Sequence, residues 1–127
     1  MLETYVNGIQ HVGVPTNDLE KTVAFYKSLG FTVALDVDNR GERVCFLTMK
    51  NLCIETYENH QAVGRSGAID HIALDVNDVD AVLAAVQAAG HSPLEGAVQF
   101  LPFWEKGVRY FTILGPNMEK VEFSQRL

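Results

Sequence analysis

Ile9-Gln10-His11-Val12-Gly13-Val14 and Ile69-Asp70-His71-Ile72-Ala73-Leu74 decide the fold, because they are two copies of one pattern, 60 residues apart. In each copy an Asn-Asp pair follows, and then an apolar stretch that ends at a glycine, Gly30 or Gly90. Six of the 23 aligned positions in residues 9–31 and 69–91 are identical. A duplicated half-domain can place its copies around a pseudo-twofold axis, so the sequence predicts two matching modules.

The first module is predicted to run strand, helix and then three strands. Its first strand is β-branched and bounded by Pro15. Asn17, followed three residues later by Glu20, resembles a capping box at the start of a helix that Gly30 closes. Residues 38–41 are expected to form a turn. The predicted strands are residues 9–14, 31–36, 44–49 and 52–57.

The second module repeats this order from Ile69. We expect a strand to Val76, a helix over residues 77–89, a weaker strand near Ser92 and a closing hairpin. The arms of that hairpin are residues 109–114 and 120–123. Residues 58–67 form a polar linker, so the sequence predicts one domain over 1–127, with modules at about 7–58 and 68–127.

Composition excludes several classes of function. Sixteen acidic against ten basic residues give a net charge of −6, which argues against a nucleic-acid surface. No apolar run approaches the roughly 18 residues of a membrane span, and the first residues lack a signal-peptide pattern. With only two cysteines, Cys45 and Cys53, we expect a reduced, cytoplasmic chain in which both are core thiols.

Matched histidines and glutamates are the candidate chemical groups. Strand alternation places His11 on a face with Gly13, and His71 on a face with Ala73, so each imidazole has a small neighbour. Glu55 and Glu122 lie 44 and 51 residues after their module's histidine. Single residues of these types are usually satisfied core histidines or solvated glutamates. The matched pairs instead favour a nitrogen and oxygen site for a divalent metal.

These residues resemble the vicinal-oxygen-chelate superfamily, which includes glyoxalase I, fosfomycin-resistance proteins, methylmalonyl-CoA epimerase and extradiol dioxygenases. The resemblance covers nearly the whole chain and is carried by residues 9–14, Phe25-Tyr26-Lys27-Ser28-Leu29-Gly30-Phe31, residues 69–74 and Gly115-Pro116-Asn117 leading to Glu122. It implies an α+β fold whose two tandem βαβββ modules form a curved mixed sheet around a metal cleft, often in a homodimer. Its ligand order implies that one divalent ion (Zn, Ni, Co, Mn or Fe) is held by His11, Glu55, His71 and Glu122.

The four-ligand set, with Glu at the second place, resembles glyoxalase I (lactoylglutathione lyase) most closely. That resemblance implies a lyase or isomerase in which a metal polarises a substrate carbonyl and stabilises an enediolate. It assigns proton transfer between adjacent carbons to Glu122, with Glu55 as its near-symmetric partner. Two alternatives stay open. One is a ligand-binding protein of the bleomycin-resistance type, and the other is an epimerase of the same superfamily.

The expected substrate is a small carbonyl compound, with no nucleic acid or membrane as partner. Glutathione-using relatives commonly carry an arginine soon after the first histidine, whereas Val12-Gly13-Val14-Pro15 holds no base. Other arginines, Arg109 among them, are therefore candidates for an anionic group of the substrate. The apolar segment with Phe100, Phe103 and Trp104 is predicted to act as a lid over the cleft, as part of a dimer interface or as simple loop packing.

Overall fold

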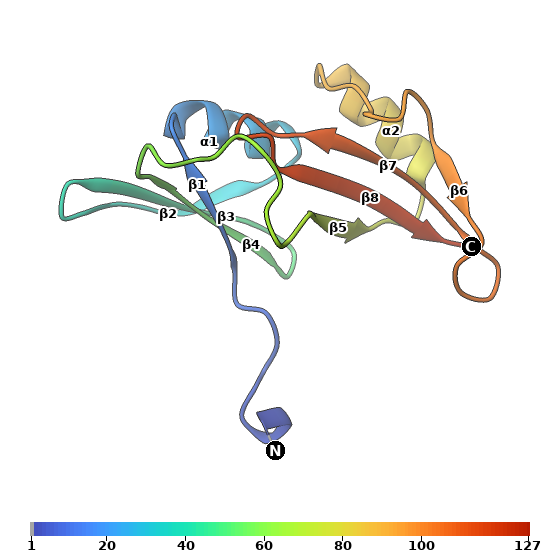
Figure 1. Cartoon of the computed structure of the whole chain (residues 1–127), viewed down its shortest axis with the longest axis horizontal. Helices are drawn as coiled ribbons and strands as arrows, with labels where there is room; N and C mark the ends of the chain where they lie inside the picture. Colours follow the sequence, from blue (N-terminus) through green and yellow to red (C-terminus); the bar gives the residue numbers. More distant parts are fainter. Residues whose placement is uncertain (1) are drawn as a thin grey trace. The chain divides into compact units, whose positions relative to one another are not determined.

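A computed structural model describes residues 2–127 and divides the chain into two compact units, which meet in sequence between Ala62 and Val63. Each unit contains one four-stranded mixed sheet and one α-helix (Figure 1). The order of elements in each is strand, helix and three strands. The predicted α+β fold of two tandem βαβββ modules is therefore confirmed.

The first unit consists of β1 (Val12–Thr16), α1 (Leu19–Ser28), β2 (Thr32–Asn39), β3 (Glu42–Met49) and β4 (Leu52–Glu58). Its strand order is β1-β4-β3-β2, with β1 parallel to β4 and the other neighbours antiparallel. The predicted hairpin of β3 and β4 is confirmed. Pro15 lies inside β1, which tolerates it because β1 is an edge strand.

The second unit consists of β5 (His71–Asp75), α2 (Val79–Ala88), β6 (Gln99–Leu101), β7 (Val108–Leu114) and β8 (Lys120–Arg126). Its strand order, β5-β8-β7-β6, repeats that of the first unit, again with the first strand parallel to the last. The strand predicted near Ser92 is wrong. The third-position strand is instead β6, which has only three residues and pairs with β7.

Both predicted first strands begin too early. Ile9 and Ile69 are about four-fifths exposed and precede β1 and β5. The segment before β1, which includes the short 3-10 turn η1 (Leu2–Thr4), extends away from the first sheet (Figure 1). The apolar character of these isoleucines therefore does not reflect a place in a sheet.

The helices begin at aspartates. The Asp18 carboxylate accepts the Lys21 N–H at 3.1 Å, and the Asp78 carboxylate accepts the Ala81 N–H at 2.9 Å. The capping box predicted at Asn17 is wrong by one residue, because the Asn17 side chain accepts the Ala62 N–H instead. Gly30 follows the last turn of α1 with a φ of 103°, which favours glycine.

A side chain from the last strand of each unit also holds the helix start. Glu58 Oε2 accepts the Leu19 N–H at 2.7 Å, and Gln125 Oε1 accepts the Val79 N–H at 2.9 Å. Leu19 and Val79, at the first position of each helix, are fully buried. One face of each sheet therefore packs on its helix, which leaves the other face to carry chemistry.

The cysteines occupy opposite faces of the first sheet. Cys45 is buried and lies opposite Thr56, while Cys53 is half-buried and lies opposite Thr48. Burial raises the pKa of the Cys45 thiol. The prediction of core thiols therefore describes Cys45 and only partly describes Cys53.

Candidate functional site

Strand alternation aims both candidate glutamates away from the helices. In β4, Ile54 and Thr56 are buried on the helix side, and Glu55 lies between them on the open face. In β8, Val121 and Phe123 are buried in the same way on either side of Glu122. The two glutamates therefore occupy equivalent positions in the two units.

The first pair of candidate ligands is His11 and Glu55. The Nε2 atom of His11 lies 2.9 Å from Oε2 of Glu55, with both side chains partly exposed. Gly13 is the register partner of Glu55 across the β1–β4 ladder, so no side chain separates the strands there. The Phe46 ring meets the imidazole edge-on, with centroids 5.8 Å apart. His11 Nδ1 donates to the Gln10 amide oxygen at 3.0 Å.

The second pair is His71 and Glu122. The Nε2 atom of His71 lies 3.2 Å from Oε2 of Glu122. Ala73 is the register partner of Glu122, as Gly13 is of Glu55. His71 Nδ1 donates to the Asp70 carboxylate at 2.9 Å, and Lys120 donates to the other Asp70 oxygen at 2.9 Å. The hydrogen bond from His71, followed by that from Lys120, lowers the pKa of Asp70 to about 2.

Both histidines thus direct Nδ1 to an oxygen of the residue that precedes them, so Nε2 is the ring nitrogen that faces the glutamate. A hydrogen bond on the other ring nitrogen is what commonly orients a metal-binding imidazole. Two donors at about 2.1 Å from one ion would lie about 3.0–3.4 Å apart at angles between octahedral and tetrahedral. The observed separations of 2.9 Å and 3.2 Å fit such an edge.

The structure thus brings the four predicted ligands together as two pairs, one in each unit. Within residues 2–127 no group of three or more histidine, cysteine, aspartate or glutamate side chains is arranged so that it could hold a metal ion. Each pair by itself supplies one nitrogen and one oxygen.

A cavity of about 590 Å³ opens on the second unit, on the face that carries Glu122. Its volume is within the usual range for small-molecule sites. The lining residues are Asp70, His71, Leu94, Glu95, Leu101, Phe103, Trp104, Val108, Tyr110, Thr112, Lys120, Glu122 and Ser124. The second pair of candidate ligands therefore lies in the wall of a hollow with a largely apolar and aromatic lining.

Two of the four predicted substrate contacts lie in this wall and two do not. Phe103 and Trp104 line the cavity. Arg109 instead forms two hydrogen bonds with Asp80 of α2, at 2.6 Å and 2.9 Å, on the helix side of the sheet. Phe100 is the register partner of Arg109, and its ring lies against Gly107. Neither Arg109 nor Phe100 is among the lining residues.

Sequence reasoning missed several lining residues, including Tyr110, Ser124 and Glu95. The alternation of β7 and β8 was sufficient to place Tyr110 and Ser124 on the face of Glu122. No such signal exists for Glu95, which lies in an irregular segment before β6. Both of its carboxylate oxygens accept the Thr112 N–H, at 2.8 Å and 3.0 Å, and this fixes its position.

A family profile described as the Glyoxalase/Bleomycin resistance protein/Dioxygenase superfamily matches residues 8–123. The chain belongs to this superfamily. Among curated proteins, the uncharacterized protein YwbC of Bacillus subtilis is similar, with 27% identity over 125 residues covering 93% of this chain and 97% of YwbC.

Solved structures of the glyoxalase superfamily share the fold. A glyoxalase family protein from Enterococcus faecalis has a TM-score of 0.80 at 19% identity, covering 94% of this chain and 98% of that one. The fosfomycin resistance protein FosX of Listeria monocytogenes, in complex with Mn(II) and sulfate, has a TM-score of 0.71 at 18% identity, covering 96% and 94%. At these identities the likeness concerns the fold, and Mn(II) is a property of FosX.

Membership of the superfamily leaves the reaction open, since one fold hosts many activities. The name of the family profile itself covers enzymes and a resistance protein. Over residues 2–127, no helix is long and apolar enough to cross a membrane.

Proposed function

We propose that this protein is a metal-dependent, glyoxalase I-like lyase or isomerase that moves a proton next to a substrate carbonyl. The observation that carries the proposal is the matched pair of His–Glu contacts, each with its histidine Nδ1 hydrogen-bonded to the preceding residue. Two imidazole nitrogens and two carboxylates suit Zn, Ni, Co, Mn or Fe. One divalent ion held by all four side chains would supply Lewis acidity to the substrate carbonyl.

The protein's own residues divide the remaining work. His11 and His71 present Nε2, because Gln10 and Asp70 hold their Nδ1–H. Glu122 takes the proton from the hydroxyl-bearing carbon beside the carbonyl and delivers it to the carbonyl carbon, while the hydroxyl proton passes to the former carbonyl oxygen, so that carbonyl and hydroxyl exchange places. Its Oε2 faces His71, so Oε1 is the atom that we assign to this transfer. Glu55 holds the equivalent position in the first unit and is the second candidate base.

The remaining parts of the proposal concern the setting of the reaction. The substrate is a small carbonyl compound, and the protein acts as a homodimer in the cytoplasm. The aromatic side chains of Phe103 and Trp104 are more than half exposed, and burial against a second copy is one role for them. Arg109 forms an ion pair with Asp80, so we assign it no contact with the substrate.

Metal content separates the proposal from a ligand-binding protein that needs no metal. Purified protein loaded with Zn, Ni, Co, Mn or Fe should hold about one ion per chain by elemental analysis. His11→Ala and His71→Ala should each lower occupancy at least about tenfold at limiting metal, because each removes a ligand. His60→Ala is the matched control, since His60 lies outside both pairs. Full occupancy in both ligand variants would refute the assignment.

Turnover is then measured with the hemithioacetal of methylglyoxal and glutathione, followed by other α-hydroxycarbonyl compounds and epimerase substrates. The apolar and aromatic cavity favours a second candidate function, a ligand-binding protein of the bleomycin-resistance type. That function predicts ligand binding with no dependence on metal and no turnover of any of these compounds. A metal-loaded protein that converts one of them excludes it.

A further inference from the structure

The two ends of the second unit's cavity differ in chemical character, and the proposed reaction makes no use of this difference. The β7–β8 ladder pairs Thr112 with Glu122, Tyr110 with Ser124, and Val108 with Arg126. These residues share one face of the sheet and step from the His71 end of the cavity towards the end of β8. Arg126 is exposed and is not itself a lining residue, and it meets the cavity wall through its contact with Trp104. Arg126 lies four residue steps along the strand from Glu122, a rise of about 13 Å.

Acidic groups gather at the first end of this ladder. Both Glu122 and Glu95 lie beside Thr112 of β7. Glu122 is the register partner of Thr112, and the Glu95 carboxylate accepts the Thr112 N–H. Asp70 also belongs to this end, and its carboxylate neutralises the only lysine in the lining. A negatively charged ligand group therefore has no uncompensated cation to meet there.

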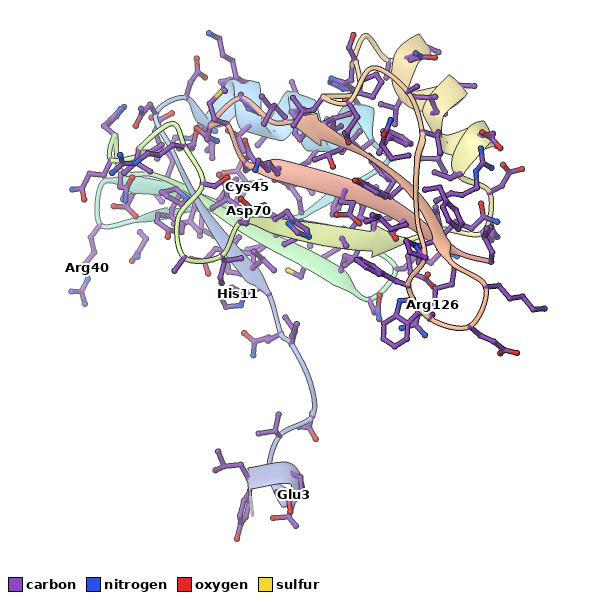
Figure 2. The ribbon with its side chains drawn as sticks, turned by 45° about the vertical axis from the view of Figure 1, so that its right-hand side comes forward. Glu3, His11, Arg40, Cys45, Asp70 and Arg126 are labelled. Atoms are coloured by element: carbon purple, nitrogen blue, oxygen red, sulfur yellow. The ribbon has the colours of Figure 1, made fainter. Side chains whose placement is uncertain are left out.

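The opposite end is aromatic and cationic. The Arg126 guanidinium lies 3.7 Å from the centre of the Trp104 ring. Figure 2 shows Arg126 at the end of the last strand, beside the loop that holds Trp104. Across residues 2–127 no carboxylate forms an ion pair with Arg126, whereas acids engage Arg43 and Arg109. A guanidinium stacked on a ring keeps its edge N–H groups free to bind a carboxylate in a bidentate manner.

We propose that the cavity binds a planar, aromatic carboxylic acid, with its ring between Trp104 and Tyr110 and its carboxylate on Arg126. Leu101, Phe103 and Val108 supply the remaining apolar wall at this end. This names a substrate class for the proposed function and rests on it in one respect: the end of the ligand nearest His71 and Glu122 carries the reacting carbonyl. The binding of the ring and carboxylate rests on the cavity alone.

The single tryptophan of the chain provides a direct reporter. Its indole N–H gives one unambiguous cross-peak in a proton–nitrogen correlation spectrum of the full-length protein. The protein is titrated, with EDTA present, with trans-cinnamate and separately with cinnamyl alcohol, which has the same ring and no charge. We expect cinnamate to shift the peak saturably and to bind at least about fivefold more tightly than the alcohol, since hydrogen bonds to charged groups are the stronger ones.

Arg126→Gln removes the charge and keeps a shorter polar side chain. It should weaken cinnamate about tenfold and change the alcohol less than about twofold. Arg40→Gln is the matched control, because Arg40 lies in the exposed turn between β2 and β3 of the first unit. It should change neither affinity.

Three outcomes would overturn the proposal: no saturable shift with either compound up to about 10 mM, equal binding of acid and alcohol, or cinnamate binding unaffected by Arg126→Gln. Because EDTA removes metal from these titrations, each result is independent of the metal site. A failure here leaves the His–Glu assignment standing, and a failure of metal loading leaves this result standing.

Discussion

The two His–Glu pairs have the same geometry and different surroundings. In the first unit, the His11 imidazole forms a hydrogen bond with the neutral Gln10 amide and contacts the Phe46 ring in an edge-on arrangement. In the second unit, His71 forms a hydrogen bond with the Asp70 carboxylate, and Lys120 donates a hydrogen bond to the other oxygen of that carboxylate. Duplication has kept the atoms that would bind a metal and changed the groups that stand behind them. The His–Glu contact is therefore common to both copies, and the group that supports the histidine differs between them.

The nature of the supporting group has a direct chemical consequence. A carboxylate on Nδ1–H increases the electron density at Nε2 more than an amide does, so His71 is the stronger donor. Glu122 is also the better shielded of the two glutamates, with 18% of its side chain exposed against 25% for Glu55. Both differences assign the second unit the leading role in the proposed reaction.

The largest expected effect breaks the symmetry of the glutamates. Glu122→Gln keeps an oxygen ligand and removes the base, so kcat should fall by about 10²–10⁴-fold. Glu55→Gln should lower kcat less than about tenfold if Glu55 serves only as a ligand. The measurement is kcat alongside metal content for each variant. Equal losses would make the two units interchangeable, and an unchanged rate in Glu122→Gln would refute its assigned role.

A smaller effect is expected from exchanging the groups that form hydrogen bonds with Nδ1 of the two histidines. Asp70→Asn retains a hydrogen-bond acceptor without the charge and should weaken metal binding about 10-fold, within the range known for such supporting groups. The reciprocal variant, Gln10→Glu, should tighten it by a few fold. Both are measured by competition with a chromophoric chelator at constant pH. Weaker metal binding by Asp70→Asn together with tighter binding by Gln10→Glu supports the comparison. Weaker binding by both variants would mean that the substitutions disturb the packing instead.

The smallest effect concerns a feature that the two copies share. Asp18→Ala and Asp78→Ala each remove a helix cap and should each lower the free energy of unfolding by about 1 kcal/mol. Urea denaturation of the metal-free protein measures both. Asp38→Ala serves as a comparison outside any helix, since Asp38 lies near the end of β2 and its carboxylate accepts the Gly41 N–H at 2.7 Å. A cost confined to one unit would show that the helix starts have diverged as the histidine supports have.

The duplicated pattern made most of the fold predictable. Two copies of the same residues at the same spacing predicted each strand–helix unit, and strand alternation placed His11 on a face with Gly13 and His71 on a face with Ala73. The structure adds that Gly13 and Ala73 are the register partners of Glu55 and Glu122. These features depend on contacts within a strand pair or a helix turn. Their signals therefore lie within a short window of sequence.

The errors lie where a distant segment decides the outcome. Asn17 and Asp18 are both good caps, and the choice between them depends on Ala62, 45 residues away, which engages Asn17. Glu95 joins the cavity wall through the backbone of Thr112. Arg109 faces α2 because Asp80 lies there to pair with it. In each of these cases the partner is distant in sequence, so the neighbouring residues alone do not predict the contact.

One pairing in the last strand of each unit limits how these sequences can change in length. Glu55 faces the open side of β4, and Glu58, three residues on, holds the start of α1 from the other side. Glu122 and Gln125 have the same spacing in β8. Losing or gaining one residue between the members of either pair would turn one of them to the wrong face. We therefore expect these strands to accept replaced side chains, and to accept a change in length less readily than turns such as 40–41 and 115–118.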